Sequence, residues 1–126
     1  MFDLTDFDNL QHNWDGQDAI APDPEVIEYF RNVIDALTWP ESDIYADVNG
    51  TMEIESINNA SYVYHLSVGL LSYTMIFQVK GYEQITMSGI IAEEPFPVEA
   101  AQVALDLCQQ VSLEAELSKY KPGTLK

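Results

Sequence analysis

The stretch that decides the fold runs from Ile44 to Ile91 and reads IYADVNGTMEIESINNASYVYHLSVGLLSYTMIFQVKGYEQITMSGII. Apolar and polar residues alternate through much of it, which is the period of two that β-strands show. The pattern predicts five strands, at Ile44–Val48, Thr51–Ile57, Tyr62–Leu70, Leu71–Val79 and Tyr82–Ile91.

The connections between these strands are short and rich in turn-forming residues. Asn49-Gly50 is a pair that favours a two-residue hairpin turn. Asn58-Asn59 and Lys80-Gly81 suit two further connections, and Gly69 marks a bulge or turn that divides the long central stretch. Consecutive strands joined in this way predict an antiparallel meander.

The second strand shows how the sheet is expected to divide its two faces. Met52 and Ile54 alternate with Glu53 and Glu55 along the chain. Side chains of a strand point alternately to opposite faces, so one face should pack on the core and the other should present carboxylates to water.

A helix is predicted on each side of the strands. Asp23 is a suitable N-cap and Pro24 a suitable first residue for a helix that runs to about Leu37. Its apolar stripe comprises Val26, Ile27, Phe30, Val33, Ile34 and Leu37. After Pro97, a last helix of about twenty residues is predicted from its apolar spacing. Its stripe comprises Ala101, Ala104, Leu105, Cys108, Val111 and Ala115.

The length of 126 residues fits one domain, residues 1–126. Residues 1–23 read as an irregular acidic segment with a short helical turn around Thr5–Leu10, and residues 119–126 read as a loose tail. The expected fold class is α+β, with an antiparallel meander of four to five strands flanked by an N-terminal and a C-terminal helix.

Charge narrows the classes of partner. The chain carries 21 Asp and Glu residues against 5 Lys and Arg, a formal net charge of −16. Such a molecule repels nucleic acid and anionic membranes and attracts basic proteins. High negative charge can also serve solubility alone. The scarcity of Lys and Arg argues against that alternative, since ordinary soluble surfaces mix both signs.

The sequence offers no pattern typical of catalysis. It contains no glycine-rich phosphate loop, nucleophile elbow, paired-cysteine motif or His-x-x-x-His helix. His12 and His65 share no ligand spacing, Cys108 reads as a small core residue, and the N-terminal aspartates do not match a calcium loop. The expectation is therefore no enzyme, no catalytic residue, no cofactor and no metal.

The carboxylates are the remaining candidates for function. Acidic side chains fixed on a rigid helix and sheet can imitate the phosphates of a duplex and so fit a basic groove built for nucleic acid. A solvated polar face is the competing interpretation for any single residue. The predicted partner-binding set is Asp3, Asp6, Asp8, Asp15, Asp18, Glu25, Glu28, Asp35, Asp43, Asp47, Glu53 and Glu55.

Several motifs between residues 9 and 56 resemble a group of small bacterial and phage proteins. Those proteins begin with an Asn-Trp-Asp-Gly turn and continue with a Ser-Pro-Glu helix start, a Pro-Asp-Gly hairpin and a Glu-rich strand. This chain departs from them at Asp23, where serine is usual, and at Val48-Asn49, where proline-aspartate is usual. The matching segments here are Asn13-Trp14-Asp15-Gly16 with Ala19, Pro24-Glu25-Val26-Ile27, Asp47-Val48-Asn49-Gly50 and Met52-Glu53-Ile54-Glu55.

The resemblance implies a bacterial or phage origin and no particular activity. Trp14 is interpreted as a structural anchor for the N-terminal segment. Cys108 is the single cysteine, residues 1–10 lack the basic start of a secretory signal, and no stretch reaches the ~18 apolar residues of a membrane span. These features predict a protein of the bacterial host cytoplasm that binds no membrane.

Three functions fit a small acidic protein of this kind. The first is an inhibitor that occupies a basic groove of a nucleic-acid-handling complex, as phage antagonists of CRISPR or restriction systems do. The second is an antitoxin or immunity protein for a basic toxin or nuclease. The third is an acidic effector chaperone, a class that is usually dimeric, so a homodimer stays open. A chaperone would bind its effector through an apolar groove, and salt would barely weaken that binding.

Overall fold

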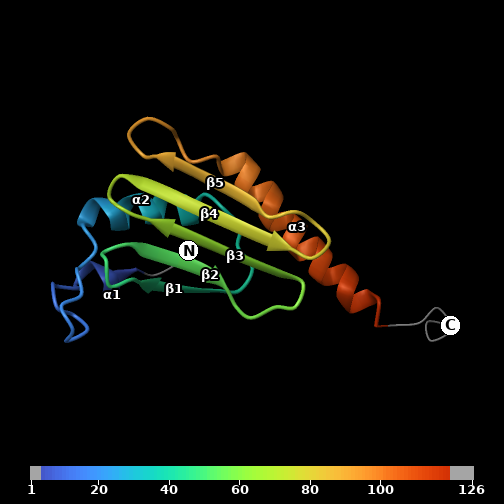
Figure 1. The fold of residues 1–126 in the computed structure, drawn as a ribbon, viewed down its shortest axis with the longest axis horizontal. Coiled ribbons are helices and arrows are strands. Elements are labelled where there is room, and N and C mark those ends of the chain that lie inside the picture. Colours follow the sequence, from blue (N-terminus) through green and yellow to red (C-terminus); the bar gives the residue numbers. More distant parts are fainter. Residues whose placement is uncertain (1–3, 120–126) are drawn as a thin grey trace.

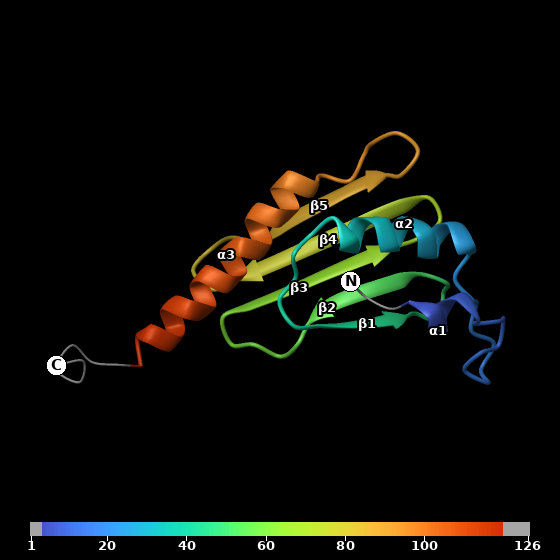
Figure 2. The same ribbon diagram turned by 180° about the vertical axis from the view of Figure 1, so that it is seen from behind.

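The computed structural model describes residues 4–119 and contains a five-stranded antiparallel sheet with two long helices on one of its faces (Figures 1 and 2). The predicted α+β fold is confirmed. The elements are α1 (Thr5–Asp8), α2 (Pro24–Asp35), β1 (Ser42–Ala46), β2 (Met52–Ser56), β3 (Tyr62–Val68), β4 (Ser72–Val79), β5 (Ile85–Ile90) and α3 (Val98–Leu117).

The strands lie in the sheet in the order in which they occur in the chain, β1-β2-β3-β4-β5. Each pairs antiparallel with the next, so the sheet is a simple meander. Figure 2 shows α2 and α3 in front of the sheet, and α2 contacts β2 and β3 while α3 contacts β3 and β4. The sheet therefore has a covered face, turned toward the helices, and an open face turned away from them.

The helices begin where their sequence signals place them. Asp23 caps α2, because its Oδ1 accepts a hydrogen bond of 2.9 Å from the backbone N–H of Glu25, and Pro24 opens the helix. α3 follows Pro97 and spans 20 residues. Its first half packs on the sheet through Ala101, Ala104, Leu105 and Cys108.

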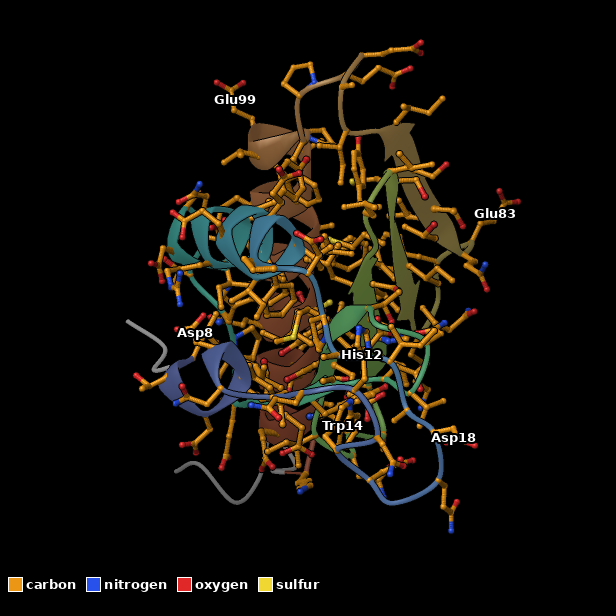
Figure 3. All side chains as sticks on the ribbon, turned by 90° about the vertical axis from the view of Figure 1, so that its left-hand side faces the viewer. Asp8, His12, Trp14, Asp18, Glu83 and Glu99 are labelled. Carbon is orange, nitrogen blue, oxygen red and sulfur yellow. The ribbon has the colours of Figure 1, made fainter. Side chains whose placement is uncertain are left out.

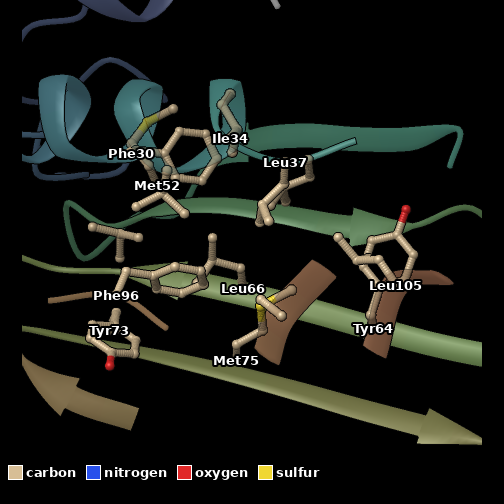
Figure 4. Packing of buried hydrophobic residues seen from close by; sticks show 14 of the residues in the cluster. Phe30, Ile34, Leu37, Met52, Tyr64, Leu66, Tyr73, Met75, Phe96 and Leu105 are labelled. Carbon is tan, nitrogen blue, oxygen red and sulfur yellow. The ribbon is translucent and has the colours of Figure 1, made fainter. Parts of the chain in front are cut away.

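The core fills the space between the covered face and the helices (Figure 4). Phe30 and Ile34 of α2 meet Met52 and Leu66 of the sheet, and all four are almost completely buried. Aromatic rings continue the core along the strands. The rings of Tyr73 and Phe96 lie edge to face with centroids 5.0 Å apart, a favourable geometry.

The first hairpin turn is longer than the sequence suggested. The prediction of a two-residue turn at Asn49-Gly50 is wrong, because the backbone N–H of Asp47 bonds to the carbonyl of Thr51 and leaves three residues between them. Gly50 has φ +88°, the left-handed conformation that closes three-residue hairpin loops and favours glycine. Gly69 belongs to a turn, since its N–H bonds to the carbonyl of Ser72.

The N-terminal segment is more ordered than the irregular chain that was expected. α1 supplies the short helical turn, and residues 12–21 form a loop held by hydrogen bonds. The predicted loose tail falls almost wholly outside the described residues, and Asp3 falls outside them too. No helix within residues 4–119 is long and apolar enough to cross a membrane.

Candidate partner-binding surface

The first hairpin carries acidic side chains onto the open face. Asp43 of β1 lies directly opposite Glu55 of β2, and Glu53 lies opposite Tyr45. Asp47 continues the same alternation and acts electrostatically on Tyr45 together with both glutamates. We call Asp43, Asp47, Glu53 and Glu55 the acidic strip. Directly opposed like charges destabilise a strand pair, so the fold tolerates Asp43 and Glu55 here at a cost.

Glu53 corrects the expectation that the second strand presents both carboxylates to water. Its side chain points to the open face, yet the residue is only 4% exposed. His65 Nε2 lies 2.9 Å from one carboxylate oxygen, and the Ser67 hydroxyl donates a hydrogen bond of 2.6 Å to the other. Buried charges need such partners. Glu53 therefore has a structural role within the strip, where its carboxylate is held away from solvent by His65 and Ser67.

The network shifts the titration of both ionic partners. Burial opposes ionisation of Glu53, but hydrogen bonds from His65 and Ser67 outweigh it and hold the pKa of Glu53 below its ordinary value. The hydrogen bond to Glu53 raises the pKa of His65 despite burial, and the charges of Glu55 and Asp47 add to this effect. The strip therefore favours a protonated imidazole.

Tyr45 closes one side of this network. Its ring stacks beside that of His65 with centroids 6.5 Å apart, and its hydroxyl lies 3.5 Å from Glu55 Oε2. Burial raises the pKa of Tyr45 to about 12, and the surrounding carboxylates contribute to the rise. A phenol in this environment stays neutral and acts as a hydrogen-bond donor.

Ser, His and Glu side chains meet here, but not in the order that activates a nucleophile. The Ser67 hydroxyl donates to Glu53, whereas a catalytic serine donates to the histidine that removes its proton. Burial raises the pKa of the Cys108 thiol to about 11, which disfavours the reactive thiolate. Within residues 4–119, no three His, Cys, Asp or Glu side chains gather as a metal site.

The N-terminal loop brings two more predicted residues beside the hairpin. The backbone N–H of Ile20 bonds to the carbonyl of Val48 over 2.7 Å, so the loop is fastened to the turn that ends β1. Asp15 Oδ1 accepts from the N–H groups of Gln17 and Ala19, and Asp18 stands exposed at φ +66°. Figure 3 shows Asp18 at the outer edge of this loop.

The loop also explains the Asn-Trp-Asp-Gly motif in structural terms. Asn13 adopts φ +66° and its side chain accepts a hydrogen bond of 2.7 Å from the N–H of Asp18. The Trp14 indole N–H donates to the carbonyl of Ile20, a contact within the loop itself. Gly16 has φ +77°, a conformation that side chains disfavour. The motif residues thus fold one compact loop.

The remaining predicted residues do not join the acidic strip. Glu25, Glu28 and Asp35 are exposed on α2, which covers the opposite face of the sheet. Asp8 and Glu28 share one cation, because the Arg31 guanidinium lies 3.1 Å from Asp8 and 2.7 Å from Glu28. Asp6 is exposed in α1. The predicted set is therefore divided between two sides of the molecule.

Few cations balance these acids. Among the described residues, only Asp8, Glu28 and Glu116 form ion pairs with Lys or Arg, and Glu53 pairs with His65. Asp43, Asp47 and Glu55 form no ion pair with a Lys, Arg or His side chain within residues 4–119. Asp43 is exposed and Asp47 and Glu55 are half-exposed, so a basic partner could reach and compensate their charge.

Sequence reasoning missed the roles of His65 and Ser67. Both residues lie at the polar positions of the alternation in β3. This pattern indicated that they share a face with Glu53. The missing information was the register, which sets Ser67 directly opposite Glu53 and His65 opposite Glu55.

Comparison of the chain with protein-family models, with curated proteins and with solved structures finds no match.

Proposed function

We propose that this protein binds a basic groove of a nucleic-acid-handling protein and blocks it by imitating phosphates, without catalysis. The contact surface is the acidic strip together with Asp15 and Asp18 of the adjoining loop. One observation carries the proposal. Asp43, directly opposite Glu55, is set with Asp47 on a rigid sheet, and no Lys or Arg among residues 4–119 bridges any of these three carboxylates.

The rigidity of this surface supports binding to a fixed groove. Strands hold successive side chains of one face about 6.8 Å apart, so Asp43 and Asp47 are held on either side of Tyr45, and Glu55 lies opposite Asp43. The Glu53–His65 pair fixes the middle of the strip from below. A preorganised surface loses little entropy on association, and its charge steers a basic partner toward it.

The test compares two variants that each remove three negative charges. The strip variant carries Asp43→Asn, Asp47→Asn and Glu55→Gln and leaves the buried Glu53 intact. The control variant carries Glu83→Gln, Glu93→Gln and Glu99→Gln, all exposed, and Figure 3 places Glu83 and Glu99 far from Asp18. Tagged proteins capture partners from bacterial lysate, and bound proteins are eluted in steps of salt and identified by mass spectrometry.

The strip variant should release its partner at lower salt than the parent protein, or not capture it at all. The control should behave like the parent, because charges beyond about 8–10 Å are screened at ordinary ionic strength. Equal release from both variants would remove the strip from the contact surface. A partner that resists salt would instead favour the antitoxin or chaperone alternatives.

A further inference from the structure

A cavity of ≈ 580 Å³ opens at the end of the sheet, outside the acidic strip. Four parts of the chain enclose it: the end of α1, the N-terminal loop with the residues before it, the start of α2, and the turns that follow β1 and β3. Its volume falls in the range of sites that bind small organic molecules. Figure 3 looks toward this end of the molecule, with His12 near its centre.

The walls of the cavity are fixed by the fold. The N–H of Ala21 donates to His12 Nδ1 over 3.2 Å, which orients the imidazole. A Cβ added at Gly50 would lie 3.1 Å from Ile20 Cγ2, so loop and hairpin turn are in close contact. The site is therefore formed in the free protein.

Apolar side chains dominate the lining. Val26 and Ile27 of α2 are buried beneath it, and Pro22 is buried at its side. Ile20 and Leu70 line it as well, yet they are 51% and 56% exposed. An aliphatic chain bound between these two residues would cover apolar surface that now meets water.

The charge of the cavity is negative. Asp8 and Asp23 line it, and none of the described residues in its wall is a lysine or an arginine. Asp8 shares Arg31 with Glu28, which leaves that cluster of two acids and one base with a net negative charge. The formal charge of −16 for the whole chain deepens this potential.

We infer that this cavity is a binding site for an aliphatic cation, an ammonium or guanidinium group carried on a short alkyl chain. The chain lies against Ile20 and Leu70, and the cation faces Asp23, a lining carboxylate that no Lys or Arg among residues 4–119 pairs. A free amine and the side chain of a lysine or arginine in a partner protein share this chemistry. The acidic strip does not line this cavity, which adjoins it through the turn at Asn49–Thr51, so the two sites can be tested by separate variants.

The test is an NMR titration of the 15N-labelled full-length protein with three probes. These are n-pentylamine, its neutral counterpart n-pentanol, and Nα-acetyl-lysine methylamide. The amine should shift the amide signals of Ala21, Gly50 and Leu70 saturably, and pentanol should bind at least ten-fold more weakly. Tighter binding of the lysine derivative assigns the site to a partner's side chain, and tighter binding of pentylamine assigns it to free amines.

Two variants of α2 provide a matched comparison. Asp23→Asn removes a charge at the cavity but keeps a good N-cap residue, so folding should be retained. Asp35→Asn removes a charge at the other end of the helix, about 18 Å away, which is about two screening lengths. We expect at least a three-fold loss of amine affinity for Asp23→Asn and less than a 1.5-fold change for Asp35→Asn.

Three results would overturn the inference: no saturable shift with any probe, equal binding of pentanol and pentylamine, or equal effects of the two α2 variants. The strip variant should bind the amine like the parent protein. Failure of the amine titration therefore leaves the proposed function of the strip intact, and failure of the strip leaves the cavity intact.

Discussion

The two faces of the sheet are built from the same strands but hold their side chains in place by different forces. On the covered face, Leu66 and Phe77 are completely buried among apolar neighbours. On the open face, the buried Glu53 contacts a histidine and a serine. Packing is tolerant of salt and pH, whereas an ionic network depends on both. The comparison teaches that apolar packing supplies most of the stability on one face, whereas ionic contacts order the side chains of the other.

The largest expected effect separates the faces by packing. Leu66→Ala on the covered face should destabilise the protein by about 3 kcal/mol, because it leaves a cavity in a closed core. Ile76→Ala on the open face of the next strand should cost about 1 kcal/mol, since that residue is half-exposed. Urea unfolding followed by circular dichroism measures both. Equal losses would show that the open face is as tightly packed as the core.

The second prediction tests whether the ionic network holds the open face together. Glu53→Gln should destabilise the protein by about 2 kcal/mol, since it removes the buried charged acceptor that His65 and Ser67 share. Glu55→Gln makes the matched change on a half-exposed neighbour and should stay within about 0.5 kcal/mol. If the two variants are equally stable, Glu53 is only another surface carboxylate.

The third prediction uses pH to distinguish the faces. The raised pKa of His65 gives stability that is complete below its ordinary pKa of 6.5 and is lost as pH rises through the folded-state value. The lowered pKa of Glu53 gives stability that is present above its ordinary pKa of 4.5 and is lost as pH falls through the folded-state value. The pair therefore contributes most between about pH 4.5 and 6.5.

The variant His65→Gln makes this window measurable. The difference in unfolding free energy between parent and variant should be largest between about pH 4.5 and 6.5 and should shrink on either side. Leu66→Ala provides the contrast, because the cost of an apolar cavity should change little over the same range. A parent–variant difference for His65→Gln that is flat with pH would contradict the ionic account.

The smallest expected effect concerns the opposed like charges of the strip. Asp43→Asn removes the repulsion with Glu55 and should stabilise the protein by about 0.2–1 kcal/mol at low salt. Added salt should reduce this gain by screening. Glu83→Gln, an exposed change beyond the end of β4, should show no comparable gain. A loss of stability in Asp43→Asn would mean that this carboxylate has a structural role.

Much of the fold could be predicted from the sequence because its signals are local. The alternation of β4 places Tyr73, Met75 and Phe77 on one face, and Asp23-Pro24 marks the start of α2. The three-residue turn before Thr51 escaped, since the same Asn-Gly pair serves hairpin loops of different length. A local sequence signal fails where the same residues are compatible with two backbone conformations.

The site was harder to predict than the fold because it depends on register and on which face the helices cover. Composition predicted that carboxylates bind a basic partner. It could not show that Asp43 and Glu55 lie on one side of the molecule and Glu28 and Asp35 on the other. Burial of Glu53 required His65 and Ser67, which come from another strand. Long-range placement, not residue type, decides which carboxylates can act together.

The most direct test of phosphate mimicry is displacement of the captured partner by nucleic acid. Bead-bound protein carrying its partner is incubated with increasing duplex DNA or RNA at constant salt, and released partner is quantified. Competition for one basic groove should release the partner in proportion to added nucleic acid. The strip variant should need less competitor than the parent. A partner that stays bound at saturating DNA and RNA would contradict the claim that the acidic strip occupies a nucleic-acid groove.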